Sequence, residues 1–133
     1  MSKRFEHKVV IVTGAAQGIG RGVALQVASE GAQVVLADFS DYVDDVLTEI
    51  THAGGQAVVV KANLETFSGA ESVVAKAVAT YGRVDVLINN VGGAIWMKPF
   101  DAFSEEEIIK EVNRSLFPTL WCCRAVLPEM IKN

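Results

Sequence analysis

An apolar run near the start of the chain breaks into a glycine-rich turn, and a helical pattern follows at once. Val9–Val12 are all apolar, and the turn Thr13–Gly20 carries Gly14, Gly18 and Gly20. Glycine lets the backbone approach a ligand closely, and a helix N-terminus offers free N–H groups and the positive end of the helix dipole. The segment therefore predicts a place where a pyrophosphate would lie against the backbone.

Strand-like and helix-like patterns alternate along the whole chain. The predicted strands are Lys8–Val12, Gln33–Asp38, Gln56–Ala62 and Arg83–Asn89. The predicted helices are Gly18–Ser29, Asp41–His52, Ser68–Tyr81 and a long last helix that opens at Ser104. Strands that are apolar on both faces and alternate with helices indicate an α/β fold, a doubly wound parallel sheet in three α/β/α layers. Right-handed crossovers then give the strand order 3-2-1-4, with the ligand crevice between strands 1 and 4.

The ends of the predicted helices carry recognisable signals. Gly31 stands where a helix C-terminus is expected, and Ser104 with Glu107 forms a capping box. Pro118 falls inside the last predicted helix. Because a proline ring crowds the carbonyl four residues earlier, here that of Arg114, we expect a bend at this point.

Length and charge limit the classes of function. The 133 residues suffice for one domain, which we take as residues 1–133, and the net charge is −4 with scattered basic residues. This disfavours nucleic acid and anionic membranes as partners. No run approaches the roughly 18 apolar residues of a membrane span, and no signal-peptide pattern opens the chain. We expect a cytoplasmic protein.

The residue types that usually bind metals are poorly placed for it. Cys122 and Cys123 are adjacent and point about 100° apart on a helix, so we expect two buried, reduced thiols. His7 and His52 fall outside the predicted crevice and are expected at the surface. The acids Glu105–Glu107 favour the start of a helix electrostatically. We expect no metal site.

An acid follows the second predicted strand. Asp38 lies 18 residues beyond Gly20, close to the spacing of a carboxylate that binds the adenosine ribose hydroxyls of a dinucleotide. The same carboxylate would repel a 2′-phosphate, which favours NAD over NADP. Phe39 beside it is suited to lie against the adenine. The alternative is that Asp38 is a solvated residue at the end of a strand.

Four motifs in order resemble the short-chain dehydrogenase/reductase family. The spacing Thr-Gly-x-x-x-Gly-x-Gly has the form of that family's cofactor turn, and Asn89-Asn90-Val91-Gly92 resembles its Asn-Asn-Ala-Gly. Val112-Asn113 is similar to the family's asparagine on helix 4. Asn63-Leu64 stands where the family usually has Asp-Leu or Asp-Val. The resemblance runs from Lys8 to the end of the chain.

This resemblance implies a Rossmann-like fold that lacks the C-terminal strands of the full family fold, with NAD as cofactor and Asn113 as a catalytic residue. An uncharged asparagine in place of the usual aspartate also implies a weaker contact with the adenine. The residues implied in cofactor binding are Gly14, Gln17, Gly18, Ile19, Gly20, Asp38, Phe39, Asn63, Leu64, Asn90, Val91 and Gly92.

Within the family, Asn90–Phe100 resembles the cis-dihydrodiol dehydrogenases of benzoate and toluate breakdown. Those enzymes oxidise a dihydroxycyclohexadiene carboxylate with NAD, and the product becomes a catechol. Ile95–Met97 would then form an apolar wall for a six-membered ring, and Lys98 would attract a carboxylate. The alternative is that Trp96 and Phe100 pack the loop and Lys98 is solvated. Trp121 is expected in the core or in a subunit contact.

The catalytic tyrosine of the family stands four residues before a lysine. Tyr42 and Tyr81 are followed at that distance by Val46 and Asp85. We therefore expect the NAD-binding half of such an oxidoreductase, with a small-molecule substrate and the base and lysine outside these residues. The alternatives are a truncated or engineered nucleotide-binding module without turnover, and a structural piece that folds and oligomerises without ligand.

The predicted fourth strand leads to a further expectation. Val84–Asn89 would form an apolar parallel edge of the sheet, and such edges recruit other strands. One face of the last helix would also be uncovered. We expect a homo-oligomer or poor solubility.

Overall fold

Four parallel strands form one sheet in the computed structural model, which describes residues 2–133. The strands are β1 (Val9–Thr13), β2 (Gln33–Ala37), β3 (Gln56–Val60) and β4 (Val86–Ile88). Their order is β3-β2-β1-β4, and all neighbouring pairs are parallel. The predicted fold class and strand order are therefore confirmed.

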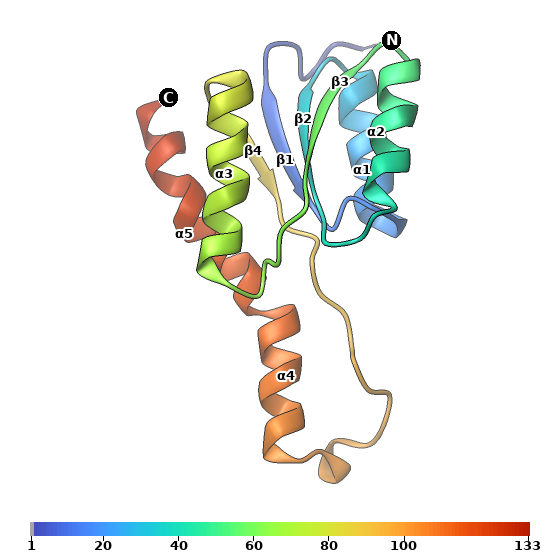
Figure 1. Cartoon of the computed structure of the whole chain (residues 1–133), viewed down its shortest axis with the longest axis vertical. Helices are drawn as coiled ribbons and strands as arrows, with labels where there is room; N and C mark the ends of the chain where they lie inside the picture. Colours follow the sequence, from blue (N-terminus) through green and yellow to red (C-terminus); the bar gives the residue numbers. More distant parts are fainter. Residues whose placement is uncertain (1) are drawn as a thin grey trace.

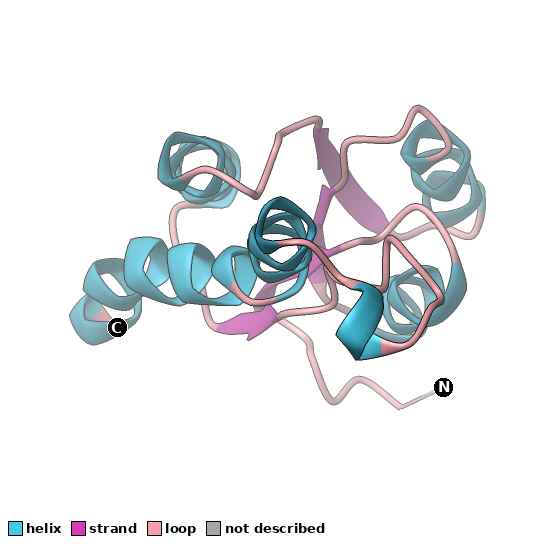
Figure 2. Cartoon of the chain, turned by 90° about the horizontal axis from the view of Figure 1, so that it is seen from below, coloured by secondary structure: helices cyan, strands magenta, loops and turns pink. Residues whose placement is uncertain are grey.

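Helices cover both faces of this sheet, as Figures 1 and 2 show. They are α1 (Gly18–Ser29), α2 (Val43–His52), α3 (Phe67–Tyr81), α4 (Glu105–Ser115) and α5 (Phe117–Lys132), with a short 3₁₀ helix η1 (Phe100–Ala102) before α4. Strand β1 is fully buried and its side chains alternate between the two faces. Val10 and Val12 pack with α1 and α2, whereas Val9 and Ile11 pack with α3 and α5.

Several predicted boundaries shift by a few residues. Helix α2 begins at Val43 rather than Asp41, because Asp41 and Tyr42 belong to the preceding turn. Helix α3 begins at Phe67 rather than Ser68, since the Thr66 hydroxyl accepts the N–H of Gly69 at 3.1 Å and caps the helix. Strands β3 and β4 are shorter than predicted, and β1 includes Thr13 instead of Lys8.

The prediction of one long last helix is wrong, whereas the expected bend near Pro118 is present as a break between two helices. Helix α4 ends at Ser115, Leu116 lies between the helices with φ −100° and ψ −50°, and α5 begins at Phe117. Pro118 lies in the first turn of α5, where a residue needs no N–H donor. The helix is therefore divided before the proline. Pro128 is the proline inside α5.

Helix α4 extends beyond the carboxyl ends of the strands, and the long segment after β4 runs down to its start (Figure 1). That helix packs mainly against α5. The predicted capping box is confirmed, since Ser104 Oγ accepts the Glu107 N–H at 3.2 Å and Glu107 Oε1 accepts the Ser104 N–H at 2.9 Å. Both hydrogen bonds hold the start of α4 in place.

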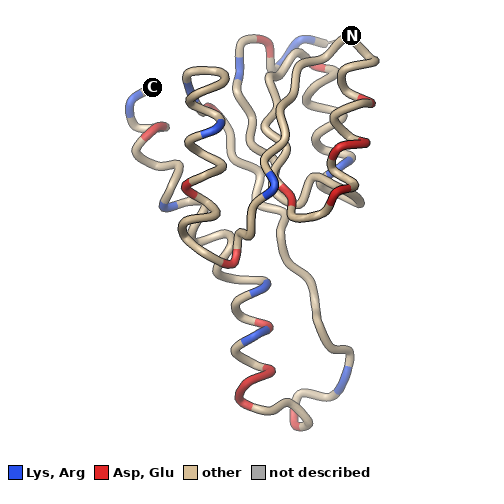
Figure 3. The backbone as a smooth tube through the Cα atoms, in the orientation of Figure 1, with Lys and Arg blue, Asp and Glu red and all other residues tan. Residues whose placement is uncertain are grey.

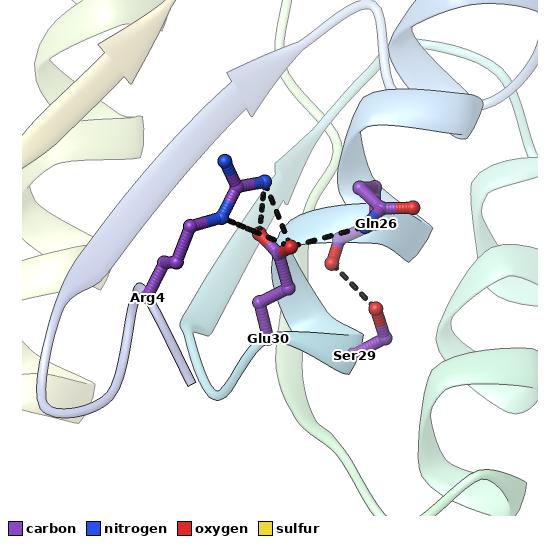
Figure 4. Close-up of polar contacts among 4 residues, drawn as sticks. All are labelled: Arg4, Gln26, Ser29 and Glu30. Carbon is purple, nitrogen blue, oxygen red and sulfur yellow. Dashed lines mark hydrogen bonds and ion pairs between the residues drawn. The ribbon is translucent and has the colours of Figure 1, made fainter. Parts of the chain in front are cut away.

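An ion pair between Arg4 and Glu30 connects the N-terminal segment to the end of α1 (Figure 4). Both carboxylate oxygens of Glu30 accept from the Arg4 guanidinium, at 2.7 Å and 2.8 Å from Nη2, and Gln26 Nε2 donates to Glu30 Oε1 at 3.3 Å. Glu30 is buried, and Gly31 follows it with φ +98°, as expected of a helix C-terminus. This arrangement satisfies a buried carboxylate.

The cysteine prediction holds for one residue of the two. Cys122 is buried, and its burial raises the pKa of the thiol to about 11. Cys123 is half-buried instead, and its sulfur accepts from Asn89 Nδ2 at 3.5 Å. His7 and His52 are exposed, as predicted. Residues 2–133 contain no cluster of three metal-binding side chains, and none of their helices is long and apolar enough to span a membrane.

Candidate functional site

A cleft of about 620 Å³ lies at the carboxyl ends of the strands, where the segments that follow β1, β2, β3 and β4 meet. Ligands of open parallel sheets bind at this edge. The cleft is lined by Gly14, Gln17, Ile19, Asp38, Phe39, Ala62, Asn63, Leu64, Glu65, Asn90, Val91, Gly92 and Arg114. The structure therefore brings together most of the predicted cofactor-binding residues.

Gly18 and Gly20 do not line the cleft, although both shape the turn beside it. Gly14 and Gly18 have φ of +64° and +59°, which L side chains rarely adopt. A Cβ on Gly20 would lie 2.0 Å from the carbonyl oxygen of Gly14 and 2.5 Å from Asn90 Nδ2. The first turn of α1 can therefore approach the β1–α1 turn only with glycine at this position.

Asp38 supports the turn as well as lining the cleft. Its Oδ2 accepts the N–H of Ala16 at 2.9 Å, and its Oδ1 accepts the N–H of Ser40 at 2.9 Å. The residue is half-buried. An ionised carboxylate has about four lone-pair sites, so both oxygens can accept further hydrogen bonds from a ligand. Asp38 is therefore more than a solvated residue at the end of a strand, because it accepts two backbone hydrogen bonds.

A network of hydrogen bonds connects the glycine turn after β1 to the segment after β4. Thr13 Oγ1 donates to the carbonyl of Ile88 at 3.3 Å and accepts the N–H of Asn90 at 2.9 Å. Asn90 Nδ2 donates to the carbonyl of Gly14 at 3.2 Å. These contacts join the ends of β1 and β4. The buried Thr13 was not among the predicted site residues, because a threonine at the end of an apolar run is also typical of a strand.

The segments after β2 and β3 form another part of the cleft. Phe39 is 78% exposed and therefore free to contact a ring, whereas Leu64 is buried in the floor. Asn63 Oδ1 accepts the N–H of Glu65 at 3.0 Å, which holds the segment after β3 in a tight turn. Ala62 and Glu65 line the cleft without having been predicted, and only their position beside Asn63 and Leu64 could have indicated them.

Asn113 is half-buried on α4 and is not among the residues that line the cleft. Its catalytic role therefore stays a prediction. The next residue, Arg114, lines the cleft instead and was not predicted. A basic residue near the end of a helix is also common for the helix dipole, so the sequence pattern alone did not distinguish it.

The loop after Gly92 folds along α4. Glu111 Oε1 accepts the N–H groups of Ile95 and Trp96 at 2.7 Å and 3.0 Å. Lys98 Nζ lies 2.8 Å from each carboxylate oxygen of Glu107, and this hydrogen bond is the main reason why the pKa of Glu107 is lowered. Lys98 is therefore neither a free group in the cleft nor simply solvated.

The aromatic residues of this loop pack against one another. The rings of Trp96 and Phe103 meet edge to face with centroids 6.2 Å apart, and Lys98 Nζ lies 5.1 Å from the Phe103 centroid. These contacts favour the packing interpretation of Trp96. Met97 and Phe100 remain 92% and 74% exposed. On α5, Trp121 is half-buried and stacks on Phe117 at 5.2 Å, which agrees with its predicted place in the core.

Comparison with protein families places the chain among known sequences. The model of the family described as short chain dehydrogenase matches residues 8–133. The chain is 70% identical over 132 residues to a 1,6-dihydroxycyclohexa-2,4-diene-1-carboxylate dehydrogenase of Acinetobacter baylyi, covering 99% of this chain and 51% of that protein. It is 49% identical over 133 residues to a protein of the same name from Pseudomonas putida, covering 100% of this chain and 49% of that protein. The chain thus spans about half the length of these relatives.

Solved structures give the same picture of the backbone. A short-chain dehydrogenase/reductase from Burkholderia xenovorans matches with a TM-score of 0.92 and 32% identity, over 98% of this chain and 54% of that chain. A 7α-hydroxysteroid dehydrogenase solved with NADH and 7-oxoglycochenodeoxycholic acid matches with a TM-score of 0.92 and 33% identity, over 99% of this chain and 51% of that chain. Each similarity again covers about half of the known protein.

Proposed function

The chain belongs to the short-chain dehydrogenase family, and from this premise we propose that its cleft binds NAD for the oxidation of a cis-dihydrodiol carboxylate. We propose residues 1–133 as one cytoplasmic NAD-binding domain of that enzyme. The observation that supports the proposal most strongly is the cleft itself, in which Asp38 and the glycine turn share one surface with Asn90.

The shape and chemistry of the cleft fit a dinucleotide. The absence of a Cβ at Gly20 lets the first turn of α1 lie close to Gly14, so that backbone N–H groups at the helix start are near a bound pyrophosphate. The spare lone pairs of Asp38 suit two ribose hydroxyls. Phe39 and Leu64 offer apolar surface for the adenine, and Asn63 stands beside them.

Charge at the adenosine end favours NAD over NADP. Asp38 is the acid that a 2′-phosphate would meet. Lys61 directly follows β3, and its Nζ lies 2.8 Å from both Asp41 Oδ1 and Asp44 Oδ2. These hydrogen bonds raise the pKa of Lys61. The positive charge of Lys61 is therefore already paired with the two aspartates. Among the described residues that line the cleft, the segments after β2 and β3 contribute no basic side chain that could balance a further phosphate.

For the whole enzyme we propose the reaction named by its relatives. The substrate would lose a proton from its hydroxyl and a hydride from the carbon that carries it, and NAD, when bound, would supply the hydride acceptor; loss of carbon dioxide would then give a catechol. Asn113 is proposed as the catalytic residue that this chain contributes, as the family resemblance implies. The proton acceptor is assigned to the half of the relatives that this chain does not span, because neither Tyr42 nor Tyr81 has a lysine four residues later.

Titration of the chain with NAD by calorimetry tests the binding proposal. The D38N variant replaces one acceptor oxygen by an N–H₂ group, and losing hydrogen bonds to a charged group costs about 1.5–3 kcal/mol. We expect NAD affinity to fall at least about tenfold, and the preference for NAD over NADP to shrink. The matched control is D45N, an exposed aspartate on α2 outside the cleft. Equal affinity of both variants for NAD would contradict the proposal.

A further inference from the structure

We propose that Arg114 binds the phosphates of the dinucleotide, which extends the proposed function to a residue with no assigned role. Its side chain is exposed, and among the residues that line the cleft it is the only basic one. It makes no ion pair or side-chain hydrogen bond within residues 2–133. Because no carboxylate of the described residues pairs with the Arg114 guanidinium, it is available to an anionic group of a ligand.

Basic side chains on the segments next to the cleft already make ion pairs. Lys61 is held between Asp41 and Asp44, and Lys98 is held by Glu107. Figure 3 shows acidic residues beside basic ones along α4, and Lys110 pairs there with Glu106 at 3.3 Å. Arg114 therefore differs from its neighbours in being both in the cleft and unpaired.

The backbone around Arg114 is fixed to the wall of the cleft. The hydroxyl of Ser115 accepts the N–H of Gly93 at 3.2 Å and donates to its carbonyl at 3.3 Å. A Cβ on Gly92 would lie 3.6 Å from the Cα of Ser115, so α4 passes close to this segment. The last turn of α4 is thus attached to the Asn90–Gly92 side of the cleft, and Asn90 in turn bonds the glycine turn through Gly14.

The charges of the cleft require such a group. Asp38 and Glu65 line it with two carboxylates, and a pyrophosphate adds further negative charge. The start of α1 contributes about half a positive charge through its dipole. A guanidinium supplies a full charge and can bind two phosphate oxygens at once through its planar fork.

The anion could come from two sources, the phosphates of the cofactor or the carboxylate of the substrate. We assign Arg114 to the phosphates because it shares one cleft with Gly14, Gln17 and Asp38. The loop Ile95–Lys98, which carries the apolar side chains suited to a ring, lies outside the lining of this cleft.

The experiment compares adenosine, ADP and NAD as ligands of the chain and of the R114Q variant by calorimetry. We expect R114Q to weaken ADP and NAD about 5- to 20-fold and to leave adenosine unchanged. The dependence of log affinity on log salt concentration should become flatter, because one fewer cation contacts phosphate. R114K should recover part of the loss. The matched control K110Q removes a lysine from the same helix outside the cleft and should bind all three ligands like the unaltered chain.

The other outcomes are equally informative. Equal weakening of adenosine and ADP would show that Arg114 only supports the fold, and unchanged binding of ADP would also overturn the assignment. Normal ADP binding with loss of benzoate binding to the NAD-saturated variant would move Arg114 to the substrate carboxylate. If the unaltered chain bound none of the three nucleotide ligands, the proposed function would fail first and the role of Arg114 with it.

Discussion

At Gly20 the backbone of α1 lies so close to the β1–α1 turn that one added carbon would meet the Gly14 carbonyl at 2.0 Å. Gly22, two residues further along α1, has nothing within 4 Å of a Cβ added there. The two glycines therefore have different physical roles. The first permits the turn to form, whereas the second only loosens the helix.

G20A is expected to destabilise the chain by about 1–3 kcal/mol, because an overpacked backbone contact must be relieved by moving the turn. NAD binding should weaken with it. G22A is the control and should raise the free energy of unfolding by about 0.5–1 kcal/mol, as alanine favours a helix more than glycine does. Urea unfolding followed by circular dichroism measures both variants, and similar stabilities would refute the distinction.

The ion pair between Arg4 and Glu30 predicts that the free energy of unfolding depends on pH. The hydrogen bonds from Arg4 lower the pKa of the Glu30 carboxyl. The ionised form is therefore stabilised in the folded chain. Its contribution is present above the ordinary glutamate pKa of about 4.3 and is lost as pH falls through the lower native value.

E30Q is therefore expected to be less stable than the unaltered chain at pH about 7, and this difference should shrink at pH about 3. The measurement is urea unfolding at both pH values, with K3Q as a control for loss of an exposed charge. A difference in stability that stayed the same at both pH values would show that titration of Glu30 does not affect the stability of the fold.

Among the elements, α4 depends most on local signals, since it packs mainly on α5 and has no fully buried residue. Its start is stabilised by the capping box and by Lys98, which meets the same carboxylate of Glu107. The position of Pro118 predicted a bend, but it did not show that the helix would divide into α4 and α5 at Leu116. Proline is tolerated in the first turn of a helix, and Pro118 lies there with its side chain buried.

S104A is expected to cost about 1 kcal/mol, the usual value for losing an N-cap side chain. The loss should be seen as faster amide hydrogen exchange in the first two turns of α4. S72A makes the same substitution within α3 and should change stability by less than about 0.5 kcal/mol. Unchanged exchange in α4 would mean that tertiary contacts, rather than the cap, hold its start.

For the whole molecule we propose self-association. Strand β4 lies at one edge of the sheet, and α4 and α5 expose a stripe of apolar side chains at helical spacing. The most exposed members are Ile109 (53%), Leu116 (51%), Leu120 (47%), Leu127 (50%) and Ile131 (80%). An apolar stripe of this kind is favourably buried against a second copy.

Equilibrium sedimentation at micromolar concentration is expected to show a dimer or larger assembly. The L116E/L120E double variant should shift it to the monomer, because charges then face the partner helix. K76E, on the exposed face of α3, is the matched control and should remain associated. A monomeric unaltered chain would refute the proposal.

Local sequence patterns were enough to predict the alternation of strands and helices, the order of the sheet, and the meeting of Gly14, Asp38 and Asn90 at one edge. These features follow from local patterns and from the handedness of crossovers, which depend on neighbouring residues. The folded chain was needed to show that the last helix divides at Leu116, that Glu107 binds Lys98, and that Arg114 borders the cleft. Each of these features depends on contacts between side chains from separate segments, and such contacts cannot be predicted from a local sequence pattern.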